Sequence, residues 1–285
     1  MLKNYLIFVM HYLYFKKMIN AKKILLCPPV YYDIEYSINP WMHIEEKVNK
    51  KDVLSEYKEL KKLYDKLQIP YDELTPTNGL PDQVYTTDTG VPVGKIFIKS
   101  NFRYGQRKPE SAVSAAYFEK KGYAVYNLPP TVSFEGQGDL VRADHTYFMG
   151  WGQRTSYEAE DFLIHALQKE VVTLQLTNPN FFHLDTCFAP LSQNIAIYYP
   201  GAFTDEGKQT LDEYFEDLIA VNRNDANVFA CNVIKIDNHI LVNKNISDNL
   251  KKTLENYGFT VHGLKMTEYL KGGGSVKCVS LQIFI

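Results

Sequence analysis

Five segments with a helical pattern recur along the chain, and each is followed within a few residues by a short β-rich run. The helical segments are residues 52–68, 109–121, 156–168, 205–217 and 247–257. The runs that follow them are IPYDEL, YAVYNL, VVTLQL, LIAVN and FTVHGL. A spacing of roughly fifty residues between these units indicates an internal repeat. An ordinary open α/β sheet would show the same alternation, so the periodicity alone leaves both architectures open.

Further β-rich runs complete the predicted framework. They are KILLC, KIFIKS, TYFMGW, NIAIYY, VIKIDNHILV and VSLQIFI. Gly122 and Gly258 stand where two of the helices should end, and Thr155 with Glu158 has the spacing of a capping box. Because no Pro-, Gly- or Ser-rich linker divides the sequence, residues 18–285 are predicted to form a single α/β domain.

The first residues, MLKNYLIFVMHYLYF, combine a lysine with an apolar run, as a signal peptide does. His11 and several tyrosines interrupt the run, no small-residue cleavage site follows it, and it is too short to span a bilayer. Met18 opens a second plausible start, just before the first predicted strand. We therefore expect residues 1–17 to be an extension outside the fold, with a working signal or anchor as the less favoured alternative.

The composition narrows the class of protein. A chain of 285 residues, 45% of them hydrophobic, can bury a large core, which excludes a disordered protein. A formal net charge of -2 gives no bulk attraction to nucleic acid or to an anionic membrane, so a small molecule is the expected partner. The four cysteines form no CxxC pair, which argues against a zinc site or a disulfide framework and favours reduced thiols in the cytoplasm. The sequence does not indicate an oligomeric state.

Four widely separated stretches carry residues suited to chemistry. They are PDQVYTTDTG at 81–90, FEGQGD at 134–139, FFHLDTCFAPL at 181–191 and GGGSVKC at 272–278. Each has an ordinary structural explanation when taken alone, because glycine-rich loops are often solvated and cysteines before apolar strands are usually core residues.

Together with SNFRYGQRKPE and GWGQRTS, these stretches resemble the sequence blocks of the guanidino-group-modifying enzymes, the pentein superfamily. This superfamily includes arginine deiminase, dimethylarginine dimethylaminohydrolase and arginine:glycine amidinotransferase. The resemblance runs from about Lys22 to the C-terminus, with all blocks in the family's order. It implies an α/β fold, a five-bladed α/β propeller of ββαβ units with pseudo-fivefold symmetry around one central site.

The resemblance also implies a catalytic cysteine, histidine and glutamate. Cys278 stands where the family carries its nucleophile, and cysteine attacks well even when it is only partly ionised. His183 matches the general acid/base, and Glu135 would orient its ring or stabilise the imidazolium. The glycines before Cys278 would let the backbone pass close to a substrate. The remaining cysteines are expected to be core thiols: Cys27, Cys187 and Cys231.

A guanidino substrate requires carboxylates, because it arrives as a cation whose charge is shared by three nitrogens. Asp88 and Asp185 are the first candidates, since carboxylate oxygens match the forked donors of a guanidinium. Asp82 is a further candidate, although a turn residue after Pro81 is a nearly equal explanation. The implied reaction is attack by Cys278, expulsion of an amine or ammonia, and hydrolysis of a covalent amidino-thioether.

Recognition of the rest of the substrate is assigned to two arginines. Arg154 falls where family members bind the substrate's α-carboxylate. The chain has Asn101 where relatives with an SRFR-like block carry another arginine, so that contact is missing or is made by Arg103. We therefore expect arginine or a methylated arginine as the substrate, and a guanidine without the carboxylate stays open as an alternative.

Two positions bear on the subfamily. Asp185 follows the histidine by two residues, as in deiminases and amidinotransferases, and Asp88 replaces the asparagine of the PDxVFTAN block of some bacterial relatives. The expected reaction is hydrolysis of a guanidino C–N bond. An amidinotransferase, which shares the covalent half-reaction, is the alternative that the sequence does not separate from it. A non-catalytic binding protein is least favoured, because the implied site residues are all present. No metal or organic cofactor is expected, since the histidines lie too far apart in sequence to suggest a ligand cluster.

Overall fold

The internal repeat is present as five three-stranded sheets in residues 20–284, the part of the chain that the computed structural model describes. The expected extension, residues 1–17, and the alternative start at Met18 lie outside the described residues. In every one of these sheets, the middle strand pairs antiparallel with one neighbour and parallel with the other. This is the strand arrangement of a ββαβ unit.

The bounds of the elements are as follows. The strands are β1 (Lys23–Leu26), β2 (Tyr71–Glu73), β3 (Gly90–Val93), β4 (Ile96–Lys99), β5 (Ala124–Asn127), β6 (Leu140–Ala143), β7 (Thr146–Trp151), β8 (Val171–Gln175), β9 (Phe188–Pro190), β10 (Ile195–Tyr198), β11 (Asp217–Ala220), β12 (Ile234–Ile236), β13 (His239–Asn243), β14 (Thr260–Leu264) and β15 (Leu281–Ile283). The α-helices are α2 (Lys50–Lys66), α3 (Lys108–Lys120), α4 (Gly136–Asp139), α5 (Ala159–Leu167), α6 (Asp205–Tyr214), α7 (Arg223–Ala226), α8 (Asp248–Asn256) and α9 (Thr267–Leu270). The 3-10 helices are η1 (Pro81–Val84), η2 (Thr86–Thr89), η3 (Gly105–Arg107), η4 (Leu184–Thr186) and η5 (Pro200–Ala202).

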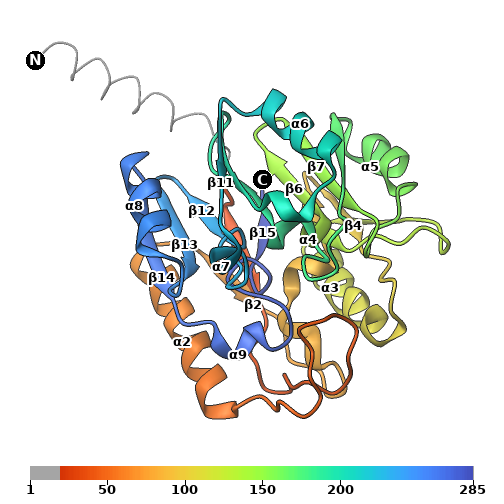
Figure 1. The fold of residues 1–285 in the computed structure, drawn as a ribbon. Helices are drawn as coiled ribbons and strands as arrows, with labels where there is room; N and C mark the ends of the chain where they lie inside the picture. The colour runs from red at the N-terminus through yellow and green to blue at the C-terminus, as the bar shows by residue number, and fades with distance from the viewer. Residues whose placement is uncertain (1–19, 285) are drawn as a thin grey trace, which may run out of the picture.

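Consecutive strands build four of the sheets, β3-β4-β5, β6-β7-β8, β9-β10-β11 and β12-β13-β14. Because a tight turn cannot reach a parallel strand, a helix makes the crossover to the third strand in each: α3, α5, α6 and α8. The fifth sheet, β15-β1-β2, contains both ends of the described chain, with Lys23 of β1 opposite Ile283 of β15 (Figure 1). The two ends of the repeat are thereby joined in one blade.

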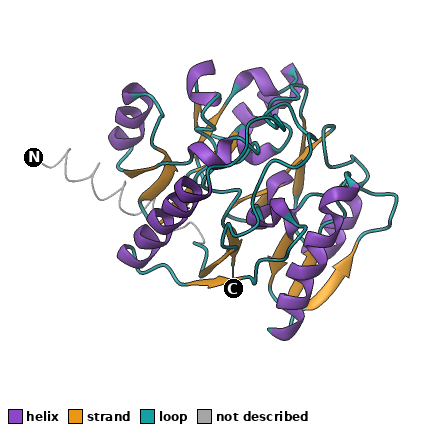
Figure 2. Ribbon diagram, turned by 90° about the horizontal axis from the view of Figure 1, so that it is seen from below, coloured by secondary structure: helices purple, strands orange, loops and turns teal. Residues whose placement is uncertain are grey.

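Most of the helices lie toward the outside of the molecule, with most of the strands between them (Figure 2). Asn49 starts α2 by accepting the N–H groups of Lys51 and Asp52, and the helix buries one apolar stripe that includes Val53 and Leu60. Packing between helix and sheet repeats in the next blade, where Phe97 of β4 stacks on Phe118 of α3 with ring centroids 4.3 Å apart.

The first strand of each unit lies nearest the axis of the molecule. Side chains from β3, β6, β9, β12 and β15 all line one cavity of about 60 Å³, which requires these strands to surround a common centre. A parallel bridge between Val93 and Phe284 joins two neighbouring sheets beside this cavity. The five-bladed α/β propeller expected from the family resemblance is thus confirmed.

The five predicted helices are all present, and their ends differ by at most three residues from the sequence expectation. Gly122 and Gly258 follow helices with φ of 81° and 89°, the left-handed conformation that glycine adopts easily, so both predicted helix stops are confirmed. The predicted capping box is wrong, because α5 begins only at Ala159. Thr155 instead donates its hydroxyl to Asp139 Oδ2, at 2.7 Å, inside the molecule.

Among residues 20–284, no helix combines the length and the apolar character that crossing a bilayer requires.

Candidate active site

Four of the sequence blocks converge because each stands shortly before one of the axial strands. Asp88 lies in η2, directly before β3, and Glu135 precedes α4, which leads into β6. Asp185 lies in η4 before β9, and Cys278 precedes β15. Since these strands surround one axis, the turns at their N-terminal ends meet at one end of that axis.

A small cavity lies where these turns meet. Five of the predicted site residues line it: Asp82, Asp88, Arg154, His183 and Cys278. Its volume of about 10 Å³ is close to the room that one water molecule needs. An amino-acid-sized molecule can therefore enter only if part of the wall moves.

The connection between β1 and α2 supplies one wall of this cavity. The carbonyl oxygen of Ile38 accepts a hydrogen bond from Arg154 Nη2 at 2.9 Å. Asn39 Nδ2 donates to the carbonyl of Gly272, 3.0 Å away, in the glycine-rich stretch before Cys278. These two contacts hold the connection against the cavity.

The sulfur of Cys278 is held by polar neighbours. Asn232 Nδ2 donates to Sγ at 3.1 Å, and Asn232 Oδ1 accepts the backbone N–H groups of Lys277 and Cys278 at 2.9 and 3.1 Å. The carboxylate oxygens of Asp185 lie 3.8 and 4.0 Å from Sγ. Burial, followed by the negative charges of Asp185 and Asp88, raises the pKa of Cys278 well above its ordinary value. The group is therefore a thiol at neutral pH in the substrate-free site.

The glycines before Cys278 are required by close packing. A Cβ atom at Gly274 would overlap the ring of Tyr85, and one at Gly272 would overlap the Tyr85 hydroxyl. Gly273 has a φ of +84°, which strains any residue with a side chain. The stretch is thus a tightly fitted turn that delivers Cys278 to the cavity.

His183 lies between two carboxylates. Its Nε2 donates to Glu135 Oε2 at 2.8 Å, and its Nδ1 is 3.5 Å from Asp88 Oδ1. Burial alone would lower the pKa of His183, but the carboxylates of Asp88, Asp139 and Glu135 raise it to about 9. The ring therefore carries a proton at neutral pH.

Glu135 is held as a carboxylate by three donors. Besides His183, Arg154 Nη1 donates to Oε2 at 3.0 Å and the backbone N–H of Arg103 donates to Oε1 at 3.1 Å. Burial alone would raise the pKa of Glu135, but Arg154 and His183 bring it below its usual range. Glu135 can thus orient the ring of His183 and stabilise its positive charge.

A buried arginine, Arg107, binds several carboxylates, one of which is Asp88, the neighbour of His183. Arg107 Nη1 donates to Asp88 Oδ2 at 2.7 Å, and Nη2 donates to Glu110 Oε2 at 2.8 Å. Its Nε lies 3.9 Å from Asp82 Oδ2. Burial raises the pKa of Glu110 to about 8 although Arg107 opposes the shift, and burial also raises the pKa of Asp82. One guanidinium is thus shared among three carboxylates.

Two carboxylate oxygens at the cavity are left without a hydrogen-bond partner. Asp82 Oδ2 accepts the hydroxyl of Tyr36 at 2.9 Å, but Asp82 Oδ1 and Asp88 Oδ1 are buried and unpartnered within residues 20–284. Leaving a buried acceptor unsatisfied costs about 1–3 kcal/mol, and more for a charged group. A cation with N–H donors would satisfy both oxygens.

The carboxylate of Asp185 forms an ion pair with Lys277. Lys277 Nζ lies 3.1 Å from Asp185 Oδ2 and also donates to the carbonyl of Gln137 at 2.7 Å. Burial raises the pKa of Asp185, although Lys277 opposes this shift. The same carboxylate therefore contacts both the ammonium group of Lys277 and the sulfur of Cys278.

The two predicted arginines are placed differently. Arg154 lines the cavity, but Nη1 and Nη2 are bonded to Glu135 and to the carbonyl of Ile38. Arg103 is exposed, and its Nη1 donates to the carbonyl of Gln153 at 3.1 Å, so its guanidinium does not line the cavity. Binding of the substrate's carboxylate by either arginine stays a prediction.

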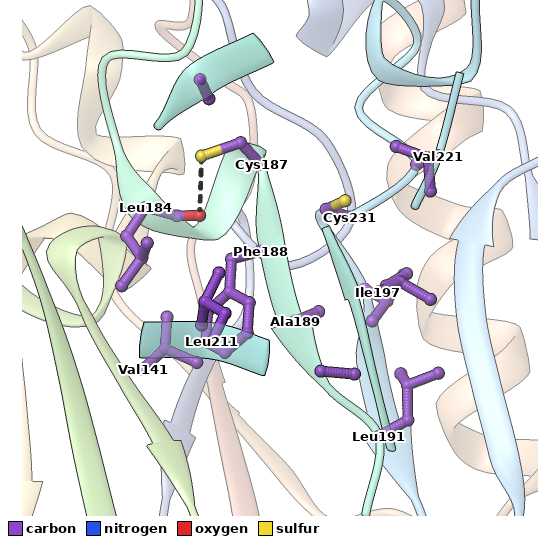
Figure 3. Close-up of a cluster of buried hydrophobic side chains, with 14 of the residues drawn as sticks. Val141, Leu184, Cys187, Phe188, Ala189, Leu191, Ile197, Leu211, Val221 and Cys231 are labelled. Atoms are coloured by element: carbon purple, nitrogen blue, oxygen red, sulfur yellow. Dashed lines mark hydrogen bonds between the residues drawn. The ribbon is translucent and has the colours of Figure 1, made fainter. Parts of the chain in front are cut away.

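The other cysteines are buried in the core, as expected. Cys187 and Cys231 lie in the hydrophobic cluster of Figure 3, where the thiol of Cys187 donates to the carbonyl of Leu184 at 3.4 Å. Burial raises the pKa of both thiols. Cys27 is also buried, with a pKa raised to about 12. These thiols lie outside the cavity that Cys278 lines.

Sequence reasoning did not identify several residues that support the site. Arg107 and Glu110 lie in the SNFRYGQRKPE block, in which the family resemblance points only to Asn101 and Arg103. Asn232 precedes the axial strand β12, so the repeat itself predicts a functional side chain near that position. Lys277 adjoins the nucleophile in sequence, but its partner Asp185 could not be read from spacing. Within residues 20–284, no group of three or more His, Cys, Asp or Glu side chains is placed to share a metal ion.

Comparison with known proteins supports this arrangement. Residues 34–285 match the family model for N,N dimethylarginine dimethylhydrolase, eukaryotic. The chain is 36% identical over 272 residues to the bifunctional arginine dihydrolase/ornithine cyclodeaminase AgrE of a Nostoc species, covering 93% of this chain but only 38% of that relative. It is 34% identical over 266 residues to the N(G),N(G)-dimethylarginine dimethylaminohydrolase of Mycobacterium tuberculosis, covering 93% of this chain and 86% of that relative.

Solved structures show the same similarity. The N-terminal domain of ArgZ, covalently bound to a reaction intermediate, superposes with a TM-score of 0.87 at 35% identity. This match covers 92% of this chain and 97% of that one. Both the family match and these relatives extend over the blocks that form the cavity, and the chain therefore belongs to the dimethylarginine dimethylaminohydrolase family of guanidino-group-modifying enzymes.

Proposed function

We propose that the protein is a cysteine-dependent hydrolase that cleaves a guanidino C–N bond of arginine or a methylated arginine. The observation that carries the proposal is the cavity beside Cys278, where Asp82 Oδ1 and Asp88 Oδ1 are buried and accept no hydrogen bond from the described residues, 20–284. Two carboxylate oxygens that accept no hydrogen bond from residues 20–284, next to a thiol, suit a cation that presents N–H donors around an electrophilic carbon. Relatives that act on arginine or dimethylarginine support this substrate class.

Binding comes first in the proposed mechanism. A guanidinium remains charged at any physiological pH, and its forked N–H groups match carboxylate oxygens. Asp88 accepts one donor through Oδ1, and Asp82 accepts another through its own Oδ1. Asp185, beside the sulfur, is the third carboxylate assigned to the guanidinium. Arg154 is the candidate for the α-carboxylate, and Arg103 would need to turn toward the cavity to contribute.

Activation of the nucleophile follows from the same charges. Burial and the carboxylates of Asp185 and Asp88 raise the pKa of Cys278, so a bound cation that offsets those carboxylates lowers it again. The thiol proton passes to water, and the thiolate then attacks the guanidino carbon. An S–C bond forms, and the tetrahedral adduct carries the electron pair on nitrogen. Collapse breaks a C–N bond and leaves an amidino-thioether on Cys278.

His183 moves the protons in this scheme. With a pKa raised to about 9 it holds a proton at neutral pH, so it can protonate the nitrogen that leaves. The neutral ring then takes a proton from water, which attacks the amidino-thioether and frees Cys278. Glu135 Oε2, which lies 2.8 Å from His183 Nε2, stabilises the imidazolium in both steps.

The direct test is product analysis with arginine, monomethylarginine and dimethylarginine. We expect citrulline together with ammonia or a methylamine, or, where a second hydrolysis follows, ornithine together with ammonia and carbon dioxide. We also expect a covalent adduct on Cys278 in acid-quenched samples analysed by mass spectrometry. Cys278→Ala should form neither. Turnover by folded Cys278→Ala at a rate near that of the parent would refute the covalent mechanism.

An amidinotransferase shares the first half of this mechanism and is the second candidate. It would release its product only when an acceptor amine is present, so product formed from the guanidine alone separates the two. A non-catalytic binding protein would bind arginine without any adduct. Three expectations stay predictions: the single-domain organisation of residues 18–285, the cytoplasmic location, and activity without a metal or organic cofactor. Unchanged activity in the presence of EDTA would support the prediction that no metal is needed.

A further inference from the structure

A second cavity lies on the propeller axis, between the five axial strands. Its volume of about 60 Å³ compares with about 10–15 Å³ for a single water molecule by the same kind of measure. The space therefore suits about four to six water-sized atoms. None of its lining residues also lines the cavity at Cys278, so the two are separate.

Lys235 of β12 lines this cavity, and its ammonium group makes no ion pair within residues 20–284, although Asp144 also lines the cavity. The residue lines the axial cavity, is 7% exposed, and its Nζ has no hydrogen-bond partner among residues 20–284. Burying a charged group without a partner costs much free energy. The burial lowers the pKa of Lys235 to about 8, with Asp237 acting in the opposite direction. Lys235 thus lacks the counter-ion that its position requires.

Arg142 of β6 provides a second cation on the same cavity. Its Nε donates to the carbonyl of Asp144 at 2.7 Å, and its Cζ lies 5.7 and 5.2 Å from the ring centroids of Tyr147 and Phe284. Within the described part of the chain, no carboxylate oxygen lies within 4 Å of its guanidinium nitrogens. The carboxylate of Asp144 instead lies 3.6 Å from Nε2 of His145.

The third cation of the cavity, Lys277, is already compensated. Its Nζ bonds Asp185 Oδ2 at 3.1 Å and the carbonyl of Gln137 at 2.7 Å. Among the described residues, Lys235 and Arg142 are therefore the cations of this cavity that make no ion pair with a carboxylate. Apolar side chains such as Val91 and Phe188 complete the wall and strengthen electrostatic interactions inside it.

We propose that the axial cavity is a binding site for a small oxyanion, held by Lys235 Nζ and the guanidinium of Arg142. Oxygen atoms of one anion can accept from both groups, and a guanidinium matches paired oxyanion oxygens. The volume admits an anion with four or five non-hydrogen atoms, such as phosphate or acetate. Such an anion would satisfy the buried ammonium group and join β12 to β6 across the axis.

The test compares the wild type with Lys235→Met and with Lys244→Met. Methionine keeps the length and apolar stem of lysine and removes the charge, and Lys244 is an exposed control at the end of β13. The midpoint temperature of thermal unfolding is measured for each protein in three separate titrations, with phosphate, acetate or chloride. The ionic strength is kept constant with sodium HEPES, whose anion is too large for the cavity.

Phosphate or acetate should raise the midpoint of the wild type and of Lys244→Met, because a ligand that binds only the folded state stabilises it. Lys235→Met should bind that anion at least tenfold more weakly by calorimetry. Without added anion, its midpoint should equal or exceed that of the wild type, since an unpaired buried charge is gone. Arg142→Met should also weaken the binding.

Equal oxyanion binding by Lys235→Met and the wild type would overturn the proposal. So would a wild-type midpoint that does not respond to either oxyanion, or that responds to chloride alone. Because Lys235 and Arg142 lie outside the cavity at Cys278, neither result depends on the proposed hydrolase activity.

Discussion

Replacing Asp88 by asparagine tests how the proposed substrate is held. Asparagine keeps the size of the side chain and one acceptor oxygen, and it removes the charge. In the structure, Asp88 Oδ2 accepts from Arg107 at 2.7 Å, whereas Oδ1 has no hydrogen-bond partner within residues 20–284. Arg107 keeps Glu110 as a partner at 2.8 Å, so the variant should still fold. Its main loss is the charge that faces the cavity.

The size of the effect follows from the hydrogen bond that the substrate would lose. A hydrogen bond to a charged group is worth about 1.5–3 kcal/mol, and every 1.4 kcal/mol is about tenfold in affinity. Asp88→Asn should therefore bind arginine about 10-fold to 150-fold more weakly. The pKa of His183 should also fall below its wild-type value of about 9, because Asp88 is one of the carboxylates that raise it.

The assay is calorimetric titration of L-arginine into Cys278→Ser, with and without Asp88→Asn, so that turnover does not interfere. Glu119→Gln, an exposed change on α3, serves as the charge-matched control and should leave the affinity unchanged. Asp82→Asn should weaken binding as well. If Asp88→Asn in this background binds arginine within twofold of its parent, the guanidinium does not use Asp88, and the reasoning from unpartnered oxygens fails.

Cys278→Ala should fold but form no product, while Cys187→Ala should keep measurable turnover; an inactive, folded Cys187→Ala would contradict the assignment of the nucleophile. His183 gains a proton on folding because its pKa rises from about 6.5 to about 9, so its stabilisation is fully present below about pH 6.5 and is lost as the pH rises through about 9. Urea unfolding should therefore show a steeper loss of stability over this range in the wild type than in His183→Gln, and identical slopes would speak against a raised pKa. Asn232→Asp replaces the donor to Sγ by a carboxylate oxygen, so alkylation of Cys278 by iodoacetamide at pH 8 should slow by about tenfold, one pKa unit; an unchanged rate would remove this residue from the control of the thiol. Arginine should have a higher kcat/KM than asymmetric dimethylarginine, because each methyl group removes a donor, and Asp185→Ala should narrow the ratio; a preference for dimethylarginine would show that one assigned aspartate points elsewhere.

The sequence predicted those parts of the fold that depend on local pattern. The five crossover helices are long enough for apolar periodicity to appear, and the strands that follow them occur within a residue or two of the expected runs. The axial strands β3, β6 and β9 were not predicted. They have three or four residues and are mostly buried, so alternation has no room to show. The run VIKIDNHILV is two strands, because Asp237 turns the chain with a φ of 51°.

The candidate site was predicted from residue types and block order, and its internal pairing was not. Nothing in the spacing of PDQVYTTDTG reveals that Asp88 binds Arg107, because that pairing depends on how η3 packs against η2. Thr155 illustrates the same limit. Its distance from Glu158 in sequence favoured a helix cap, but tertiary structure uses its hydroxyl beside Asp139. Local signals identify which residues are chemically suited, and three-dimensional packing decides their partners.

The charges around Cys278 link substrate choice to activation of the nucleophile. Burial keeps the thiol protonated, and Asp185 and Asp88 add to that effect. The carboxylates that would attract a guanidinium are therefore the same ones that hold the thiol unreactive while the site lacks a cation. A neutral molecule could fill the space without offsetting their charge, and the thiol would stay protonated. In the proposed mechanism, only a cation placed against these carboxylates lowers the pKa of Cys278, so that thiolate forms where an electrophilic guanidino carbon is already bound.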